Sequence, residues 1–209
     1  MPEKGSNRLL TIGSLLVLLA LAVSAVQPFD RLTWLMETLP VMLVLPLMWA
    51  THRRFPLTPL LSILIFMHCI VLILGGAYTY ARVPLGFVLQ DWFDLARNPY
   101  DKIGHFMQGL VPALAAREIF LRRQVVQSKA WLGFLVVCVV MTVSAVYELI
   151  EWAAALIMGQ GADEFLGTQG DVWDTQSDMF LALIGALSCL ILLSKWHDWQ
   201  LAKQVRPRL

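Results

Sequence analysis

The chain has 209 residues and a formal net charge of +1 at pH 7, and 58% of its residues are hydrophobic while only 15% are charged. Soluble domains average about 45–50% apolar and about 25% charged residues, so this composition excludes an ordinary soluble domain. The small net charge gives no electrostatic reason to expect a nucleic-acid partner. Because the apolar residues fall into long runs, we expect the lipid bilayer to be the principal partner of the chain.

Six runs are long and apolar enough to cross a bilayer, since a spanning helix needs about 20 mostly apolar residues. They cover residues 9–26, 32–50, 60–80, 103–120, 130–158 and 175–194. No soluble domain fits between them, so residues 1–209 are expected to form a single integral membrane domain. The predicted fold class is all-α, a polytopic membrane bundle of about six transmembrane helices.

The first run also has the outline of a signal peptide. Lys4 and Arg8 precede the apolar stretch, and Val23-Ser24-Ala25 resembles a small-residue cleavage site. The apolar stretch continues to Val26, which favours a retained helix. Cleavage would leave the orientation of the other five helices unchanged.

The distribution of Lys and Arg predicts the orientation of the chain. With the N-terminus inside, twelve of the 16 basic residues lie on the inner side, and such an excess is typical of cytoplasmic segments. The four on the outer side are Arg31, Arg82, Arg97 and Lys102. We therefore expect a multi-pass protein of a bacterial inner membrane with both termini in the cytoplasm.

Two outer connections stand out. Between the third and fourth runs, Leu85, Val88, Leu89, Trp92 and Leu95 recur at helical spacing. This pattern predicts a short amphipathic helix on the outer surface, or alternatively a loop packed on the helix ends. The glycine-rich stretch 159–170 is expected to form a flexible outer loop.

Polar residues gather at the outer ends of the last three runs, where a bilayer disfavours them. Counted at 1.5 Å per residue from the inner boundary, His105, Glu148 and Asp178 all lie at a height of about 25 Å. Glu151 and Asp174 lie roughly one turn further out. The spacing therefore predicts one polar site in the outer part of the bilayer. Its candidate members are Asp101, Lys102, His105, Glu148, Glu151, Asp171, Asp174 and Asp178.

The charges of this group indicate the kind of site. Several carboxylates at close range cannot all stay ionised without a cation, so a divalent metal ion, shared protons or a water-filled vestibule is needed. Carboxylates with one imidazole suit Mg²⁺, Mn²⁺ or Zn²⁺. We assign metal-ligand or catalytic roles to His105, Glu148, Glu151, Asp174 and Asp178, and substrate binding to Asp101, Lys102 and Asp171. Individually, the same residues also fit helix caps or interhelical hydrogen bonds.

The other histidines and the cysteines have simpler interpretations. His68, near the middle of the third run, is expected to make an interhelical hydrogen bond. His52 and His197 lie among interfacial residues and are expected at the surface. Tyr78 and Tyr80 fit either an interfacial belt or the lining of the site. The three cysteines lie inside apolar runs and are expected to be packing residues.

Three sequence blocks carry a resemblance to a known family. Asp-Lys-Ile-Gly-His-Phe from residue 101, Tyr-Glu-Leu-Ile-Glu-Trp from residue 147 and Gly-Thr-Gln-Gly-Asp-Val-Trp-Asp-Thr-Gln-Ser-Asp-Met from residue 167 resemble signature blocks of the bacterial inner-membrane family typified by YjdF. The resemblance covers nearly the whole chain. It implies an inner-membrane location, and the family carries no established activity.

A looser likeness is to VanZ-like membrane proteins. They share the Asp-Lys-x-x-His-Phe helix start, which here is Asp101, Lys102, His105 and Phe106. The later blocks differ, because this chain has a second Glu and an acidic Gln-Gly-Asp stretch. A role in glycopeptide resistance does not follow from this likeness.

Three functions fit the pattern. The leading hypothesis is a cation-binding site that faces the outer leaflet and acts on a lipid or lipid-linked substrate, by hydrolysis or headgroup transfer. A proton- or ion-coupled transporter is the second, but it requires a polar path to the inner side, where the runs are mostly apolar. The third is an accessory protein with a structural polar network. The chain has no nucleophile motif such as Gly-x-Ser-x-Gly, so the pattern does not select an enzyme, and it indicates no oligomeric state.

Overall fold

The computed structural model describes residues 4–158 and 168–205, and the regular elements in this part of the chain are all helices. The apolar runs form the long helices. The α-helices are α1 Lys4–Ser24, α2 Arg31–His52, α3 Pro59–Tyr78, α4 Pro84–Phe93, α5 Tyr100–Arg122, α6 Lys129–Met158, α8 Asp174–Ser188 and α9 Ser194–Val205. The all-α prediction is confirmed.

Local signals explain where several helices begin and end. The Asp30 side chain accepts a hydrogen bond from the Thr33 N–H and caps α2, and Thr58 caps α3 directly before Pro59. Such side chains satisfy N–H groups that the first turn of a helix leaves free. α4 ends at Asp94 in the left-handed conformation, with φ of 50°.

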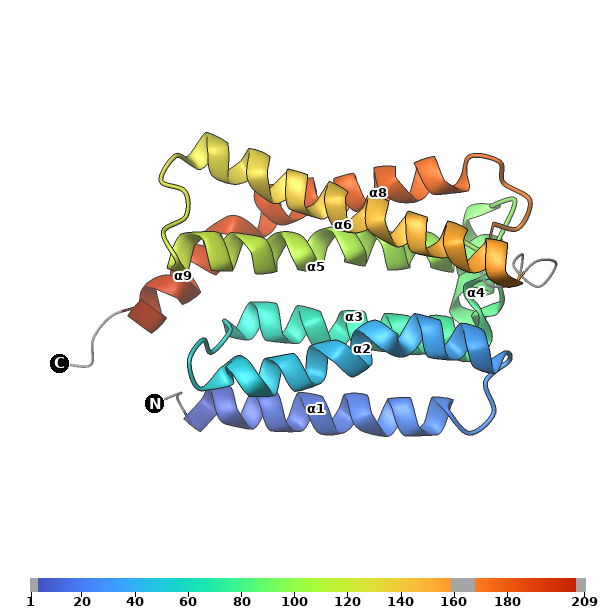
Figure 1. Ribbon diagram of the computed structural model, residues 1–209, viewed down its shortest axis with the longest axis horizontal. Helices are drawn as coiled ribbons and strands as arrows, with labels where there is room; N and C mark the ends of the chain where they lie inside the picture. Colours follow the sequence, from blue (N-terminus) through green and yellow to red (C-terminus); the bar gives the residue numbers. More distant parts are fainter. Residues whose placement is uncertain (1–3, 159–167, 206–209) are drawn as a thin grey trace.

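The long helices run side by side along one axis (Figure 1). α3 packs against α1 and α2, while α5 packs against α6 and α8, and the contact of α3 with α5 joins the two groups. α1 begins and α9 ends at the same end of the bundle (Figure 1), as an even number of crossings requires. The cytoplasmic location of that end stays a prediction.

Five helical segments in the described residues are long and apolar enough to cross a membrane, and α5 is not one of them. Its 23 residues span about 34 Å at 1.5 Å per residue, and it lies along the bundle between its neighbours (Figure 1). Because α5 packs against α3, α6 and α8, its polar groups face protein rather than lipid. Counting α5 gives the six crossings expected.

The last crossing is longer than the run 175–194 predicted. α8 continues through a π-helical turn, Cys189–Leu193, directly into α9. His197 and Gln200 on α9 are buried, whereas Lys195 and Trp199 are exposed. The expectation that His197 is a surface group was wrong, because helical spacing places it on the face of α9 that packs against the bundle.

The predicted outer amphipathic helix is present as α4, at the end of the bundle where α3 ends and α5 begins (Figure 1). It exposes large apolar side chains, among them Leu85, Phe87 and Trp92. This is the pattern of a helix that lies in the interface plane. Residues 159–167 of the expected outer loop lie outside the described residues.

α5 and α8 approach each other closely because glycines face the partner helix. A Cβ on Gly185 would collide with the Phe106 carbonyl oxygen, and one on Gly109 would collide with the Ala182 carbonyl oxygen. Small residues at such crossings let helix backbones meet in membranes. Gly109 is one turn from His105 and Gly185 is two turns from Asp178, so this contact brings the polar ends of both helices together.

Candidate functional site

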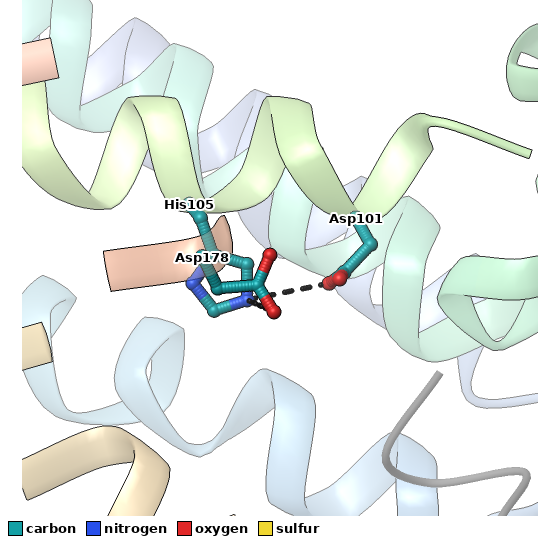
Figure 2. A group of neighbouring side chains, drawn as sticks. All are labelled: Asp101, His105 and Asp178. Atoms are coloured by element: carbon teal, nitrogen blue, oxygen red, sulfur yellow. Dashed lines mark ion pairs between the residues drawn. The ribbon is translucent and has the colours of Figure 1, made fainter. Parts of the chain in front are cut away.

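Asp101 and His105 on α5 meet Asp178 on α8, as Figure 2 shows, at the end of the bundle that the sequence predicts to be the outer one. His105 Nε2 lies 3.4 Å from Asp101 Oδ1 and 3.7 Å from Asp178 Oδ2. One ligand atom from each residue lies within 4.8 Å of the others, and all three residues are buried. The i, i+4 spacing of Asp101 and His105 places them on one helix face.

The other ring nitrogen of His105 sets the orientation of the imidazole. Nδ1 lies 2.9 Å from Gln108 Oε1, an oxygen that accepts a hydrogen bond from the Nδ1-protonated tautomer of the imidazole. Metal-bound histidines are commonly oriented in this way by an outer hydrogen bond. Nε2 is thereby turned toward the carboxylates of Asp101 and Asp178.

The two distances at Nε2 are longer than direct charged hydrogen bonds, and one of them equals the spacing of two ligands on a shared cation. Charged N–H···O hydrogen bonds are about 2.7–2.9 Å long, shorter than both separations here. Metal bonds of about 2.1 Å at a tetrahedral angle separate two ligand atoms by about 3.4 Å. The Asp101–His105 separation has this value.

Buried oxygens in this group lack partners. Asp101 Oδ2, Asp178 Oδ1 and Glu148 Oε1 have no hydrogen-bond partner among the described residues. A buried polar atom without a partner costs about 1–3 kcal/mol, more when it is charged. Each of the three oxygens is therefore free to accept a proton, a water hydrogen bond or a cation.

Glu148 and Glu151 of α6 lie on the other side of the imidazole. Glu148 Oε1 is 3.9 Å from His105 Nδ1, the nitrogen that faces away from Asp101 and Asp178. Glu151 lines the cavity beside His105. Both glutamates thus adjoin the group of Asp101, His105 and Asp178 without completing it. A cation there would polarise a substrate oxygen and activate bound water, with the free carboxylate oxygens as proton acceptors.

Asp171 and Asp174 are paired elsewhere, with Arg97. The Arg97 guanidinium lies 2.9 Å from Asp171 Oδ2 and 2.6 Å from Asp174 Oδ1, and it donates to the Thr168 carbonyl. Burial opposes the charge of Arg97, but the hydrogen bond and charge of Asp174 outweigh it and raise the Arg97 pKa. Lys102 lines a separate outer pocket beside Arg97. The base that pairs with Asp171 and Asp174 is thus Arg97 rather than Lys102, the candidate from the sequence.

A cavity of about 210 Å³ adjoins the group, several times the roughly 30 Å³ that one water occupies in the liquid. Asp101 and His105 border it, and so does Val143 of α6, which is 40% exposed. An opening of the cavity at Val143 would face the side of the bundle. Its lining residues come from α2, α3, α5, α6 and the turn after α3.

Glu37 is the main member of this cavity that sequence reasoning missed. It lies on α2, is 2% exposed, and its Oε2 accepts a hydrogen bond of 3.1 Å from the Tyr147 hydroxyl. The Tyr147 ring in turn meets the His105 ring edge-on, at 6.4 Å between centroids. A lone acid inside the apolar run 32–50 was the available signal.

His68 also lines this cavity, and its buried Nε2 has no hydrogen-bond partner among the described residues. The expected interhelical hydrogen bond was therefore wrong, because His68 faces a cavity rather than a neighbouring polar side chain. Tyr80 is buried and lines the same cavity, while Tyr78 is exposed.

A second buried polar group lies at the opposite end of α5. Glu118 accepts hydrogen bonds from the Thr58 hydroxyl at 2.7 Å, Arg122 at 2.7 Å and His197 Nε2 at 3.0 Å. Arg117 donates to His197 Nδ1 at 2.8 Å. None of these side chains has a buried atom without a partner, so this inner network is complete in itself.

The fold and this group define a polytopic helical membrane protein with a buried carboxylate–imidazole site at one end. The chain belongs to the family described as predicted membrane protein (DUF2238), which it matches over residues 9–199. It is 58% identical over 195 residues, 93% of each chain, to the inner membrane protein YjdF of Escherichia coli K12. This chain is accordingly a multi-pass inner-membrane protein. No solved structure matches it.

Proposed function

We propose that the protein binds a divalent cation through Asp101, His105 and Asp178 and uses it to hold the headgroup of a membrane lipid or lipid-linked molecule. The observation that carries the proposal is the arrangement of one imidazole nitrogen and two carboxylates within 4.8 Å. A nitrogen ligand among oxygens favours Zn²⁺ or Mn²⁺ over Mg²⁺.

The contrast between the two ends of α5 argues against a purely structural role. The inner network around Glu118 satisfies its polar atoms, as a stabilising network should. The outer group leaves oxygens of Asp101, Asp178 and Glu148 buried and unpaired. The difference between the two groups, one at each end of α5, supports a bound component in the group of Asp101, His105 and Asp178.

The apolar layer between these ends argues against transport. His105 and Arg117 are twelve residues apart on α5, about 18 Å along the helix. Between them, Val111 and Leu114 are buried in the core beside Val140 of α6. In the described residues the cavity thus ends against closely packed side chains. This favours a binding site over a transport path through the protein.

The position of the cavity supports a substrate from the membrane. An opening at its Val143 border would face the side of the bundle, where a lipid diffuses past. Its volume of about 210 Å³ accommodates a headgroup rather than a whole lipid. Lipid chains would stay outside, against the exposed Leu39 and Leu43 of α2 and Val146 of α6.

Metal analysis of the purified full-length protein tests the proposal. We expect one equivalent of Zn²⁺ or Mn²⁺ in the parent protein, and its loss in His105→Ala and Asp178→Asn. Asp91→Asn is the matched control, because Asp91 is an exposed acid on α4. Thermal unfolding in the same detergent confirms that each variant is folded.

Two results would contradict the proposal. If the folded parent holds no stoichiometric metal after exposure to Zn²⁺ and Mn²⁺, the proposed cation site does not exist. Full metal content in both folded variants would place any bound ion outside this group. Headgroup release from phospholipid vesicles, with and without a chelator, then tests hydrolysis.

A further inference from the structure

The cavity has a second acidic wall that faces the proposed cation site. Glu37 on α2 and Glu151 on α6 line it opposite Asp101 and His105 of α5. These two glutamates are outside the group that satisfies metal-ligand spacing. A cation bound by Asp101, His105 and Asp178 therefore leaves them without a counter-charge.

Glu37 has two tyrosine hydrogen-bond partners, Tyr147 and Tyr80, and it forms no ion pair among the described residues. The Tyr147 hydroxyl donates to its Oε2 at 3.1 Å, and the carboxylate is 2% exposed. Buried carboxylates are rarely left without a positive partner, because removing the charge from water is costly. Two cavity-facing atoms in the same space, Asp101 Oδ2 and His68 Nε2, also lack partners.

The aromatic residues around Glu37 indicate which kind of cation would bind beside it. Tyr80 and Tyr147 line the cavity beside Glu37, and Tyr147 lies between Glu37 and His105. Carboxylates combined with aromatic rings form the usual environment for an organic ammonium group. Arg and Lys side chains, which would attract a phosphate group, do not line this cavity in the described part of the chain.

We propose that Glu37, Tyr147 and Glu151 bind the ammonium group of an amine-bearing phospholipid whose phosphate contacts the cation at Asp101, His105 and Asp178. The inference rests on the proposed function and names its substrate class. An ethanolamine headgroup places an ammonium a short linker away from its phosphate, and Tyr147 contacts both Glu37 and the His105 ring.

Lipid competition on the full-length protein tests this assignment. The detergent-purified protein is mixed with equal amounts of phosphatidylethanolamine and phosphatidylglycerol, and the retained lipid is counted by native mass spectrometry. We expect the parent to prefer phosphatidylethanolamine. Glu37→Gln should lower that preference about tenfold, the effect of losing one charged hydrogen bond, while the bound metal is unchanged.

Further variants guard against misfolding and surface effects. Glu151→Gln keeps the test decisive if Glu37→Gln does not fold, and it should reduce the same preference. Asp91→Asn removes an exposed acid outside the cavity and should leave the preference intact. Soluble phosphoethanolamine tests the source of the ammonium, and at equal concentration it should displace little of the lipid.

The outcomes separate the two proposals. Equal retention of both lipids by a metal-loaded parent would overturn the ammonium site and leave the cation site standing. A preference that persists in folded Glu37→Gln and Glu151→Gln would also overturn it. A preference in a parent that binds no metal would overturn the cation proposal and with it the phosphate contact, and would leave only the ammonium contact of Glu37, Tyr147 and Glu151. Full displacement by phosphoethanolamine would overturn the membrane source of the ligand.

Discussion

The close contact between α5 and α8 should make metal binding depend on Gly185, a packing residue that is remote from the proposed ligands. We predict that Gly185→Ala abolishes metal binding although Gly185 lies two turns from Asp178. An added Cβ would lie 2.8 Å from the Leu110 backbone nitrogen and closer still to the Phe106 carbonyl oxygen. Neither is the end of a flexible side chain, so the helices themselves must separate.

The size of the displacement follows from these distances. The contact with Leu110 N must lengthen from 2.8 Å to at least the 3.4 Å of ordinary contact, and the contact with Phe106 O must lengthen more. Metal–ligand distances tolerate only about ±0.2 Å. Asp178 moves with α8 while Asp101 and His105 stay with α5, so we expect metal affinity to fall at least tenfold. Overpacking of this kind also costs about 1–3 kcal/mol of stability.

Metal content and thermal unfolding, measured together, check this prediction. Gly133→Ala on α6 is the matched control, because its added methyl group meets nothing within 4 Å, and an alanine there should be neutral or stabilising. The reasoning is refuted if Gly185→Ala keeps full metal content and the parental unfolding temperature. An equal loss in Gly133→Ala would show that any helix substitution has this effect.

Three further predictions follow from individual contacts. Gln108→Ala removes the hydrogen bond to His105 Nδ1 and should weaken metal binding about 10–100-fold in metal titrations, whereas unchanged affinity would show that Gln108 does not orient the ring. Glu118→Ala leaves Arg122 and His197 without their carboxylate and should cost about 3–5 kcal/mol in denaturant unfolding, with metal content preserved in folded protein. The hydrogen bond from the Thr33 N–H lowers the Asp30 pKa. Asp30→Ala should therefore cost about 1 kcal/mol of stability near neutral pH. This difference in stability should vanish as acid protonates Asp30 in the parent protein.

The extent of successful prediction differs between the helices and the site. Every predicted apolar run became a helix, since a bilayer requires each segment to satisfy its own backbone hydrogen bonds. The end of the last run was misplaced because α9 buries His197 on one face only, and an average over hydropathy does not register a single face. His68 was misassigned because its environment is a cavity that several helices build together.

Within the site, helical spacing correctly placed Asp101 and His105 on one face, and the depth count correctly brought Asp178 to their level. The same count placed Asp174 one turn further out, but it gave no reason to assign Asp174 a different role from Asp178. That choice depends on Arg97, which lies between α4 and α5 and pairs with Asp174. Glu37 was overlooked because it comes from a helix without any polar block of its own.

The sequence by itself determined that this chain is a membrane bundle with unexplained polarity at one end of its last helices. Composition, run length and spacing are properties of single segments, and a bilayer acts on segments one at a time. Only the tertiary structure decided which acids meet. The glycine contact of α5 with α8 brings Asp178 close to His105. Arg97 forms ion pairs with Asp171 and Asp174 and holds them apart from this group. Glu37 of α2 lines the cavity. These outcomes depend on how helices pack against one another.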